Sequence, residues 1–181
     1  MSDIRNDVER VLVSKEEINE IVKRLGAEIS RDYADKEPVL ITVLKGAFIF
    51  MADLVREITV PCTLDFMAVS SYGCGTETSG KVRIIKDLET NIEGKDVIIV
   101  EDILDSGVTL SHLMELLQAR KPNSMKICTL FDKPERHKVE IEVAYQGTVV
   151  PNEFIVGYGL DYAEKYRNLA DVCVLKREIY E

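Results

Sequence analysis

The sequence predicts an α/β protein built on a parallel-rich β-sheet. Short apolar runs typical of buried strands alternate along the chain with segments whose apolar residues recur at helical spacing. No repeat, linker or low-complexity segment interrupts this alternation. The 181 residues, 46% of them apolar, are enough to bury a proper core. We therefore expect a single domain over residues 1–181.

The first predicted element is an amphipathic helix that begins after Ser14. Ser14 and Glu17 have the spacing of a capping box, and apolar residues follow at helical intervals at positions 18, 21, 22, 25 and 29. Residues 39–44 (VLITVL) then predict a short buried strand. Lys45-Gly46 ends that strand, and residues 47–58 (AFIFMADLVREI) predict a helix packed on the sheet.

The rest of the chain continues the pattern. Strands are expected at 63–72, 82–88 and 97–100, and the last of these is wholly apolar and β-branched, which indicates burial on both faces. A helix is expected from Thr109 to a stop at Pro122. Three further strands are expected at 125–131, 154–159 and 172–176.

Composition excludes several classes of protein. The net charge of −9, from 32 acidic and 23 basic residues, argues against non-specific nucleic-acid binding. No apolar run is long enough to span a membrane, and the first residues lack a signal sequence, so we expect a cytoplasmic protein. The cysteines are scattered without a CxxC pair, which disfavours zinc and a disulfide framework, at positions 62, 74, 128 and 173.

The stretch VIIVEDILDSGVTL, residues 97–110, is the strongest functional motif. A buried strand leads to the carboxylates Glu101, Asp102 and Asp105, and a helix follows after Ser106-Gly107-Val108-Thr109. Ligands of parallel sheets bind beyond the carboxyl ends of the strands, and a strand–loop–helix of this kind can bind an anion through backbone N–H groups. The alternative is an ordinary acidic turn in which Ser106 caps the helix.

A second possible phosphate-binding motif is not supported by the residues that follow it. Residues 75–81 (GTETSGK) match the pattern GxxxxGK, but Val82 stands where a Ser or Thr would hold magnesium. A strand is expected next, whereas a phosphate-binding P-loop opens into a helix. A P-loop nucleotidase is therefore disfavoured.

Residues 97–110 resemble the phosphoribosyl-pyrophosphate motif of the type I phosphoribosyltransferases. From about Val39 to Leu175 the chain is similar to the hypoxanthine-guanine phosphoribosyltransferases, in segments that keep the same order: VLKGAFIFMADLVREI, DFMAVSSYG, DKPERHKV and FIVGYGLDYAEKYRNLADVCVL. This resemblance implies a mainly parallel twisted sheet flanked by helices, with a small hood from the chain ends. It also implies a pentosyltransferase of purine salvage that uses Mg²⁺, phosphoribosyl pyrophosphate and a 6-oxopurine base, and forms IMP or GMP.

The resemblance also assigns roles to the strand-end loop. Asp105, Ser106, Gly107, Val108 and Thr109 would hold the 5-phosphate, and Asp105 would also face the purine as the catalytic base. Glu101 and Asp102 would serve the ribose hydroxyls and magnesium at the other end of the same substrate.

Further roles fall on residues outside that loop. Lys45, Gly46 and Arg167 would bind pyrophosphate, with a non-proline cis peptide before or after Lys45, and Asp161 would hold a second magnesium. Lys133 would donate to the purine O6, Phe154 would stack on the base, and the Ile155 carbonyl would accept from a 2-amino group. Ser71 and Tyr72 would lead a closing loop.

Each of these residues also has a simpler interpretation. Lys45-Gly46 could be a plain turn, Lys133 a solvated lysine, Phe154 a core residue, and Asp161 with Arg167 a surface ion pair. No acid or nucleophile is spaced to indicate a catalytic role for His112 or His137.

The alternative function is a phosphoribosyl-pyrophosphate-sensing regulator of the same fold that binds nucleic acid. Such a protein needs a basic face, which disagrees with the charge of −9. The family also implies a homodimer or homotetramer without a membrane partner. The choice between hypoxanthine and guanine stays open.

Overall fold

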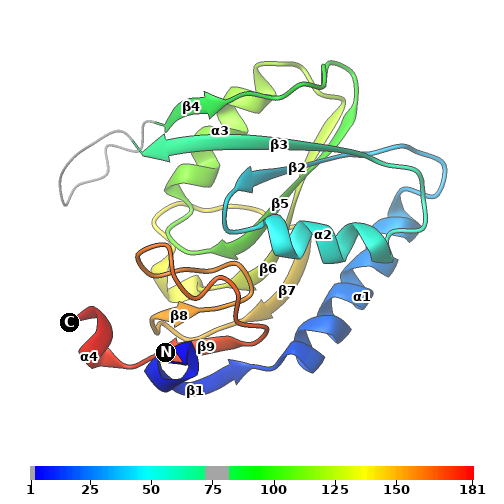
Figure 1. The fold of residues 1–181 in the computed structure, drawn as a ribbon. Coiled ribbons are helices and arrows are strands. Elements are labelled where there is room, and N and C mark those ends of the chain that lie inside the picture. The colour runs from blue at the N-terminus through cyan, green and yellow to red at the C-terminus, as the bar shows by residue number, and fades with distance from the viewer. Residues whose placement is uncertain (1–2, 72–81) are drawn as a thin grey trace.

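The computed structural model describes residues 3–71 and 82–181. Its centre is a six-stranded sheet in the order β4-β3-β2-β5-β6-β7, parallel throughout except for the antiparallel edge strand β4 (Figure 1). The strands are β2 (Val39–Leu44), β3 (Thr63–Ser71), β4 (Val82–Lys86), β5 (Asp96–Leu104), β6 (Ser124–Asp132) and β7 (Tyr145–Val149). The predicted α/β class with a mainly parallel sheet is confirmed.

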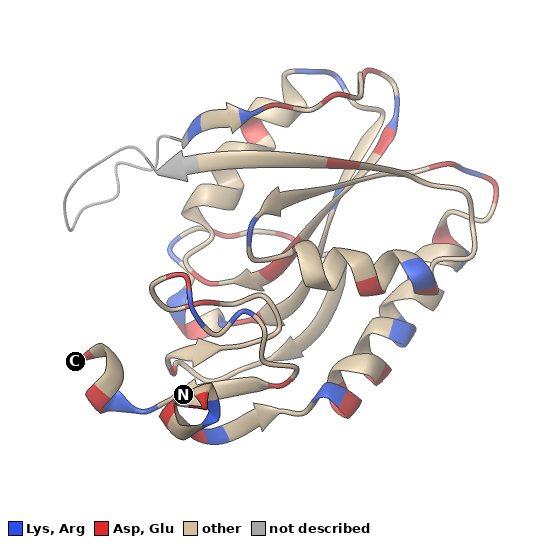
Figure 2. Cartoon of the chain, viewed as in Figure 1, with Lys and Arg blue, Asp and Glu red and all other residues tan. Residues whose placement is uncertain are grey.

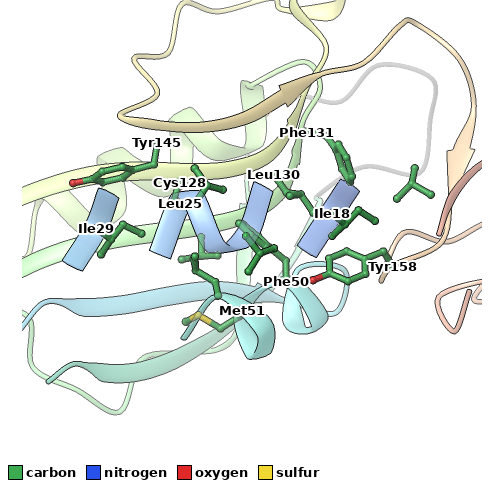
Figure 3. Packing of buried hydrophobic residues seen from close by; sticks show 14 of the residues in the cluster. Ile18, Leu25, Ile29, Phe50, Met51, Cys128, Leu130, Phe131, Tyr145 and Tyr158 are labelled. Atoms are coloured by element: carbon green, nitrogen blue, oxygen red, sulfur yellow. The ribbon is translucent and has the colours of Figure 1, made fainter. Parts of the chain in front are cut away.

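Helices cover both faces of this sheet. The predicted capping box begins α1 (Lys15–Asp32): the Glu17 N–H donates to Ser14 Oγ, and the Ser14 N–H donates to the Glu17 carboxylate at 2.8 Å. Apolar residues of α1 and α2 (Phe48–Glu57) pack in one cluster with residues of β6, as Figure 3 shows. The helix α3 (Val108–Gln118) packs on a second cluster with strands β2 and β5.

The central strand β5 contributes side chains to both clusters. Ile98 and Val100 lie in the cluster under α1 and α2, whereas Val97 and Ile99 lie in the cluster under α3, and all four are fully buried. This is the consequence of side chains that alternate between the faces of a strand. The sequence prediction of a strand buried on both sides is therefore confirmed.

The chain ends form the hood. A three-stranded antiparallel sheet runs in the order β1-β9-β8, from β1 (Val8–Val13), β9 (Val172–Leu175) and β8 (Ile155–Val156). It is flanked by the short helices η1 (Ile4–Asp7) and α4 (Arg177–Tyr180), which lie close together in Figure 1. A third short helix, η2 (Pro134–Arg136), follows β6.

Three predicted boundaries are corrected. The strand β5 continues through Glu101 and Asp102 to Leu104, because it pairs with β6 as far as Asp132. The helix α3 begins at Val108 and ends at Gln118, before Pro122. The strand expected at 154–159 covers only Ile155–Val156, since residues 157–159 all have positive φ.

Two strands were not predicted from the sequence, β1 and β7. No helix in the described residues is long and apolar enough to cross a membrane. Acidic and basic residues are interspersed along α1 and in the loop 157–171 (Figure 2). Cys74 and the GxxxxGK stretch lie outside the described residues, but the strand predicted to follow it is present as β4.

Candidate active site

Two adjoining cavities open at the carboxyl end of β5. The smaller, here the loop cavity, has a volume of about 240 Å³ and is lined by Val43, Glu101, Ile103, Leu104, Asp105, Ser106, Gly107, Thr109 and Leu110. The larger, here the hood cavity, has about 430 Å³ and is lined by Ile103, Asp105, Lys133, Arg136, Asn152, Glu153, Phe154, Ile155, Leu160 and Asp161. Ile103 and Asp105 line both, so one carboxylate faces two binding spaces.

The floor of the loop cavity is the N-terminus of α3. Gly107 is the N-cap with φ of +76°, and a Cβ there would stand 2.9 Å from the Ile141 side chain, so glycine is required. Gly107 supplies no capping side chain, but the Val108 N–H donates to Ser106 Oγ at 3.4 Å. The alternative of a turn in which Ser106 caps the helix therefore agrees with this contact. The N-terminus of α3 also faces the loop cavity, where helix amide groups can bind an anion.

The two carboxylates at 101 and 102 point to different places. Glu101 lines the loop cavity, whereas a Cβ on Gly46 would overlap Asp102 Oδ2, which puts Asp102 against the turn after β2. Burial, followed by the charge of Asp102, raises the pKa of Glu101 well above its usual value. Burial also raises the pKa of Asp102 to about 6, although the Ile103 N–H donates to it. The negative charge of each carboxylate is not fully balanced by the groups around it, which is typical of a position that binds a cation.

The turn after β2 meets the loop 157–167. The peptide bond between Leu44 and Lys45 is cis, which agrees with the first of the two expected positions. Lys45 Nζ lies 2.8 Å from Glu164 Oε2, and both side chains are exposed. Gly159, with φ of +101°, packs against the carbonyl of Gly46. The two segments that carry the expected pyrophosphate residues therefore lie together.

Arg167 is more enclosed than a surface ion pair would make it. Its guanidinium lies 2.9 Å from Asp161 Oδ1 and donates to the Gly159 carbonyl at 2.8 Å. Its Nε is buried without a hydrogen-bond partner among the described residues. A buried donor without a partner is costly, so this arrangement fits a site that receives an anionic ligand.

Lys133 is a buried cation, so its interpretation as a solvated lysine is wrong. The side chain is 7% exposed, and its Nζ donates to the Glu153 carbonyl at 2.7 Å. Burial lowers the pKa of Lys133, and the charge of Asp105 opposes that shift. The ammonium group therefore lies in the hood cavity, near Asp105.

Phe154 is 38% exposed, so it is not a core residue. The Tyr180 ring stacks on it at 4.7 Å between centroids, and Tyr162 meets it edge-on at 5.5 Å. Ile155 is buried in β8, opposite Val174 of β9. The hood sheet thus fixes the apolar wall of the hood cavity.

Two polar residues of this site were missed from the sequence. Arg136 lines the hood cavity, and its Nε donates to Asp105 Oδ1 at 2.9 Å. His137 Nε2 lies 2.7 Å from Asp132 Oδ1, an acid that the sequence spacing did not single out. His112 Nδ1 lies 3.7 Å from Glu115 Oε2. The DKPERHK stretch carried a signal, because Pro134 at the start of a short helix turns the chain back towards Asp132.

Two expectations, the closing loop and the magnesium site, are not tested by these contacts. Ser71 ends β3 opposite Val82, and Tyr72 lies outside the described residues, so the closing loop stays a prediction. Within the described part of the chain no three His, Cys, Asp or Glu residues gather as a metal cage. Glu101, Asp102 and Asp161 are therefore no preformed three-ligand site.

The comparisons with known proteins agree with this site. Residues 12–163 match the family described as the phosphoribosyl transferase domain. The chain is 54% identical over 178 residues to the hypoxanthine-guanine phosphoribosyltransferase of Bacillus subtilis, which covers 98% of this chain and 99% of the relative. It is 55% identical over 177 residues to the enzyme of the same name from Streptococcus thermophilus, at 98% coverage of both.

A solved structure gives the same result. The crystal structure of a hypoxanthine phosphoribosyltransferase from Staphylococcus aureus superposes with a TM-score of 0.96 at 52% identity, covering 99% of this chain and 98% of that one. The regulator alternative finds no support among these relatives. A full-length match in sequence and fold makes this chain a member of the phosphoribosyltransferase family.

Proposed function

We propose that this protein transfers the phosphoribosyl group from phosphoribosyl pyrophosphate to hypoxanthine and guanine, giving IMP or GMP and pyrophosphate. The observation that carries the proposal is the pair of cavities that meet at Asp105. One offers the N-terminal amide groups of α3 for a phosphate, and the other offers a buried ammonium group beside an exposed aromatic ring. The names of the full-length relatives agree with this activity.

The purine lies in the hood cavity between Phe154 and the apolar wall. Lys133 donates to the purine O6, in place of its bond to the Glu153 carbonyl. A cationic donor selects a 6-oxo group over the 6-amino group of adenine, because an amino group is itself a donor. The Ile155 carbonyl accepts from the 2-amino group when guanine is bound.

The phosphoribosyl end lies in the loop cavity. Backbone amides and hydroxyls of residues 105–109 hold the 5-phosphate, while Lys45, Gly46 and Arg167 bind the pyrophosphate. Attack by the purine N9 on the anomeric carbon forms the glycosidic bond of IMP or GMP and breaks the bond to pyrophosphate. Asp105 accepts the N7 proton, which requires its carboxylate to exchange Arg136 for the base.

Carboxylate oxygens of Glu101 and Asp102 would accept from the ribose hydroxyls, and with Asp161 they would be the oxygen ligands of Mg²⁺. Their separate positions suit Mg²⁺, which usually takes one or two carboxylates and completes its coordination with substrate oxygens and water. When bound, Mg²⁺ neutralises charge on the pyrophosphate. The raised pKa values of Glu101 and Asp102 support a cation at this position.

Initial rates with hypoxanthine, guanine, xanthine and adenine, at fixed phosphoribosyl pyrophosphate and Mg²⁺, test the proposal. Hypoxanthine and guanine should react, and adenine should not. Comparable turnover of adenine would remove the role of Lys133, and no turnover of any base would refute the activity. Pyrophosphate release measured with and without a purine base distinguishes transfer from slow hydrolysis, because hydrolysis needs no base.

The assembly and setting are also part of the proposal. Residues 1–181 form one domain, since hood residues Val13, Tyr158 and Val172 share a core cluster with α1. The protein acts in the cytoplasm as a homodimer or homotetramer, without nucleic acid or membrane. Light scattering coupled to gel filtration measures the oligomer, and a single cooperative unfolding transition would support one domain.

A further inference from the structure

The segment after β6 is joined to the strand-end loop residue by residue. Its backbone and side chains make bonds to three consecutive residues, 104, 105 and 106. These are Lys133 N–H to the Leu104 carbonyl at 2.9 Å, Arg136 Nε to Asp105 Oδ1 at 2.9 Å, and Lys138 N–H to the Ser106 carbonyl at 3.0 Å. The segment 133–138 therefore links the hood cavity to the loop cavity.

One side-chain hydrogen bond closes this segment at its base. Asp132 is the last residue of β6, is 8% exposed, and pairs in the sheet with Leu104 and Val149. Its Oδ1 lies 2.7 Å from His137 Nε2, and its Oδ2 accepts from Gln146 at 2.8 Å. The carboxylate is thus anchored in the sheet, and the ring of His137 is held to it across the turn.

The geometry of the turn shows what this contact adds. Inside the turn only two backbone bonds act, from the Arg136 N–H to the Lys133 carbonyl at 2.9 Å and from the His137 N–H to the Pro134 carbonyl at 3.3 Å. Both are local to the short helix η2 and do not attach it to the sheet. The pair of His137 with Asp132 attaches the far end of the turn to β6, and so adds to the bonds that hold Lys133 and Arg136 to residues 104 and 105.

We propose that His137 is a positioning residue for purine binding, which holds the turn 133–136 against residues 104–106 through Asp132. It touches neither substrate and lines neither cavity. Its effect reaches the base through Lys133, the residue to which O6 recognition is assigned, so the inference rests on the proposed function. A carboxylate oxygen accepts, so the ring nitrogen Nε2 carries the hydrogen of this bond.

Two substitutions separate this role from general destabilisation. His137→Ala removes the bond, whereas His137→Gln places an amide N–H at a similar reach and should retain it. His112→Ala is the matched control, since His112 is the other histidine of the chain and lies on α3 outside both cavities. Steady-state kinetics give KM for hypoxanthine, KM for phosphoribosyl pyrophosphate and kcat for each protein.

We expect His137→Ala to raise KM for hypoxanthine about tenfold, the scale of one lost hydrogen bond, with a smaller change in KM for phosphoribosyl pyrophosphate. His137→Gln should recover most of this loss, and His112→Ala should match the parent. An unchanged KM for hypoxanthine in His137→Ala would overturn the inference. So would equal losses for both substrates without recovery in His137→Gln, because that pattern indicates a structural defect.

Hydrogen exchange tests the same inference without any substrate. The amide of Lys138 bonds to the Ser106 carbonyl, so its exchange should be faster in His137→Ala than in the parent and slow again in His137→Gln. Equal exchange in all three proteins would refute the positioning role. A parent that fails to react with any purine would instead refute the proposed function, so the two failures are distinguishable.

Discussion

Replacing Gly159 with alanine places a methyl group at the contact between the loop 157–167 and the turn after β2. Gly159 has a φ of +101°, which disfavours any residue with a Cβ. The added Cβ would overlap the carbonyl oxygen of Gly46 and stand 3.2 Å from its carbonyl carbon. Both neighbours are backbone atoms, so a rotamer change cannot relieve the overlap.

The expected loss of stability has two parts. The unfavourable φ costs about 1–2 kcal/mol. Inserting a methyl group into a packed contact costs about 1–3 kcal/mol more. Gly159→Ala should therefore lower the free energy of unfolding by about 2–5 kcal/mol, and displacement of Gly46 should raise KM for phosphoribosyl pyrophosphate by about tenfold, equivalent to ~1.4 kcal/mol.

Gly94→Ala is the matched control for this experiment. Gly94 has a φ of +72°, but nothing lies within 4 Å of its added Cβ, so only the backbone cost applies. Urea unfolding followed by circular dichroism gives both free energies, because the chain has no tryptophan to report by fluorescence. The reasoning is refuted if Gly159→Ala loses no more stability than Gly94→Ala and binds phosphoribosyl pyrophosphate as the parent does.

Four other changes have definite expected results. Asp105→Asn should lower kcat by about 10²- to 10⁴-fold with little change in IMP binding, and a variant within a few-fold of the parent would contradict the assignment of the base. Lys133→Ala should weaken hypoxanthine selection in competition with adenine while KM for phosphoribosyl pyrophosphate stays nearly constant; equal loss of both affinities would point to a structural role. Excess chelator should stop turnover, and undiminished activity would exclude a required divalent ion. Burial alone would raise the pKa of Asp65, but backbone N–H donors, the strongest at Thr90, hold that pKa below its usual value. The stability that Asp65 contributes is therefore present above about pH 4 and lost as the pH falls through the lowered pKa. The difference in unfolding free energy between the parent and Asp65→Asn should shrink from pH 7 to pH 3.

Sequence patterns predicted the elements that are stabilised by contacts within the element or that consist of a continuous apolar run. The helix α1 has a capping box and a regular apolar face, and β2 is an unbroken apolar run. The strand β1 has no continuous apolar run and no local cap. Exposed residues such as Glu9 and Arg10 break its apolar pattern, and it lies at the edge of its sheet. Its partner β9 lies more than half the chain away, so only the folded structure brings the two together.

At the site, too, the sequence prediction failed where the structure depends on contacts between residues that are distant in the chain. Hydropathy placed the end of β5 at the first carboxylate, but pairing with β6 carries the strand to Leu104. Arg136 acquires a partner, Asp105, that lies 31 residues earlier, which no local pattern encodes. The roles of Lys133, Phe154 and Arg167 came from the family resemblance, and the structure adds their burial and contacts.

The position of the hood residues in the sequence determines when each cavity can form during synthesis of the chain. A nascent chain that has reached Val149 contains every strand of the six-stranded sheet and every residue that lines the loop cavity. The hood cavity needs more, because β8 pairs with β9, which ends at Leu175, and Tyr180 stacks on Phe154. Translation must therefore pass Leu175, and the segment must leave the ribosome, before this wall can form. A chain stalled between Val149 and Leu175 contains every residue that lines the loop cavity but cannot yet form this wall of the hood cavity.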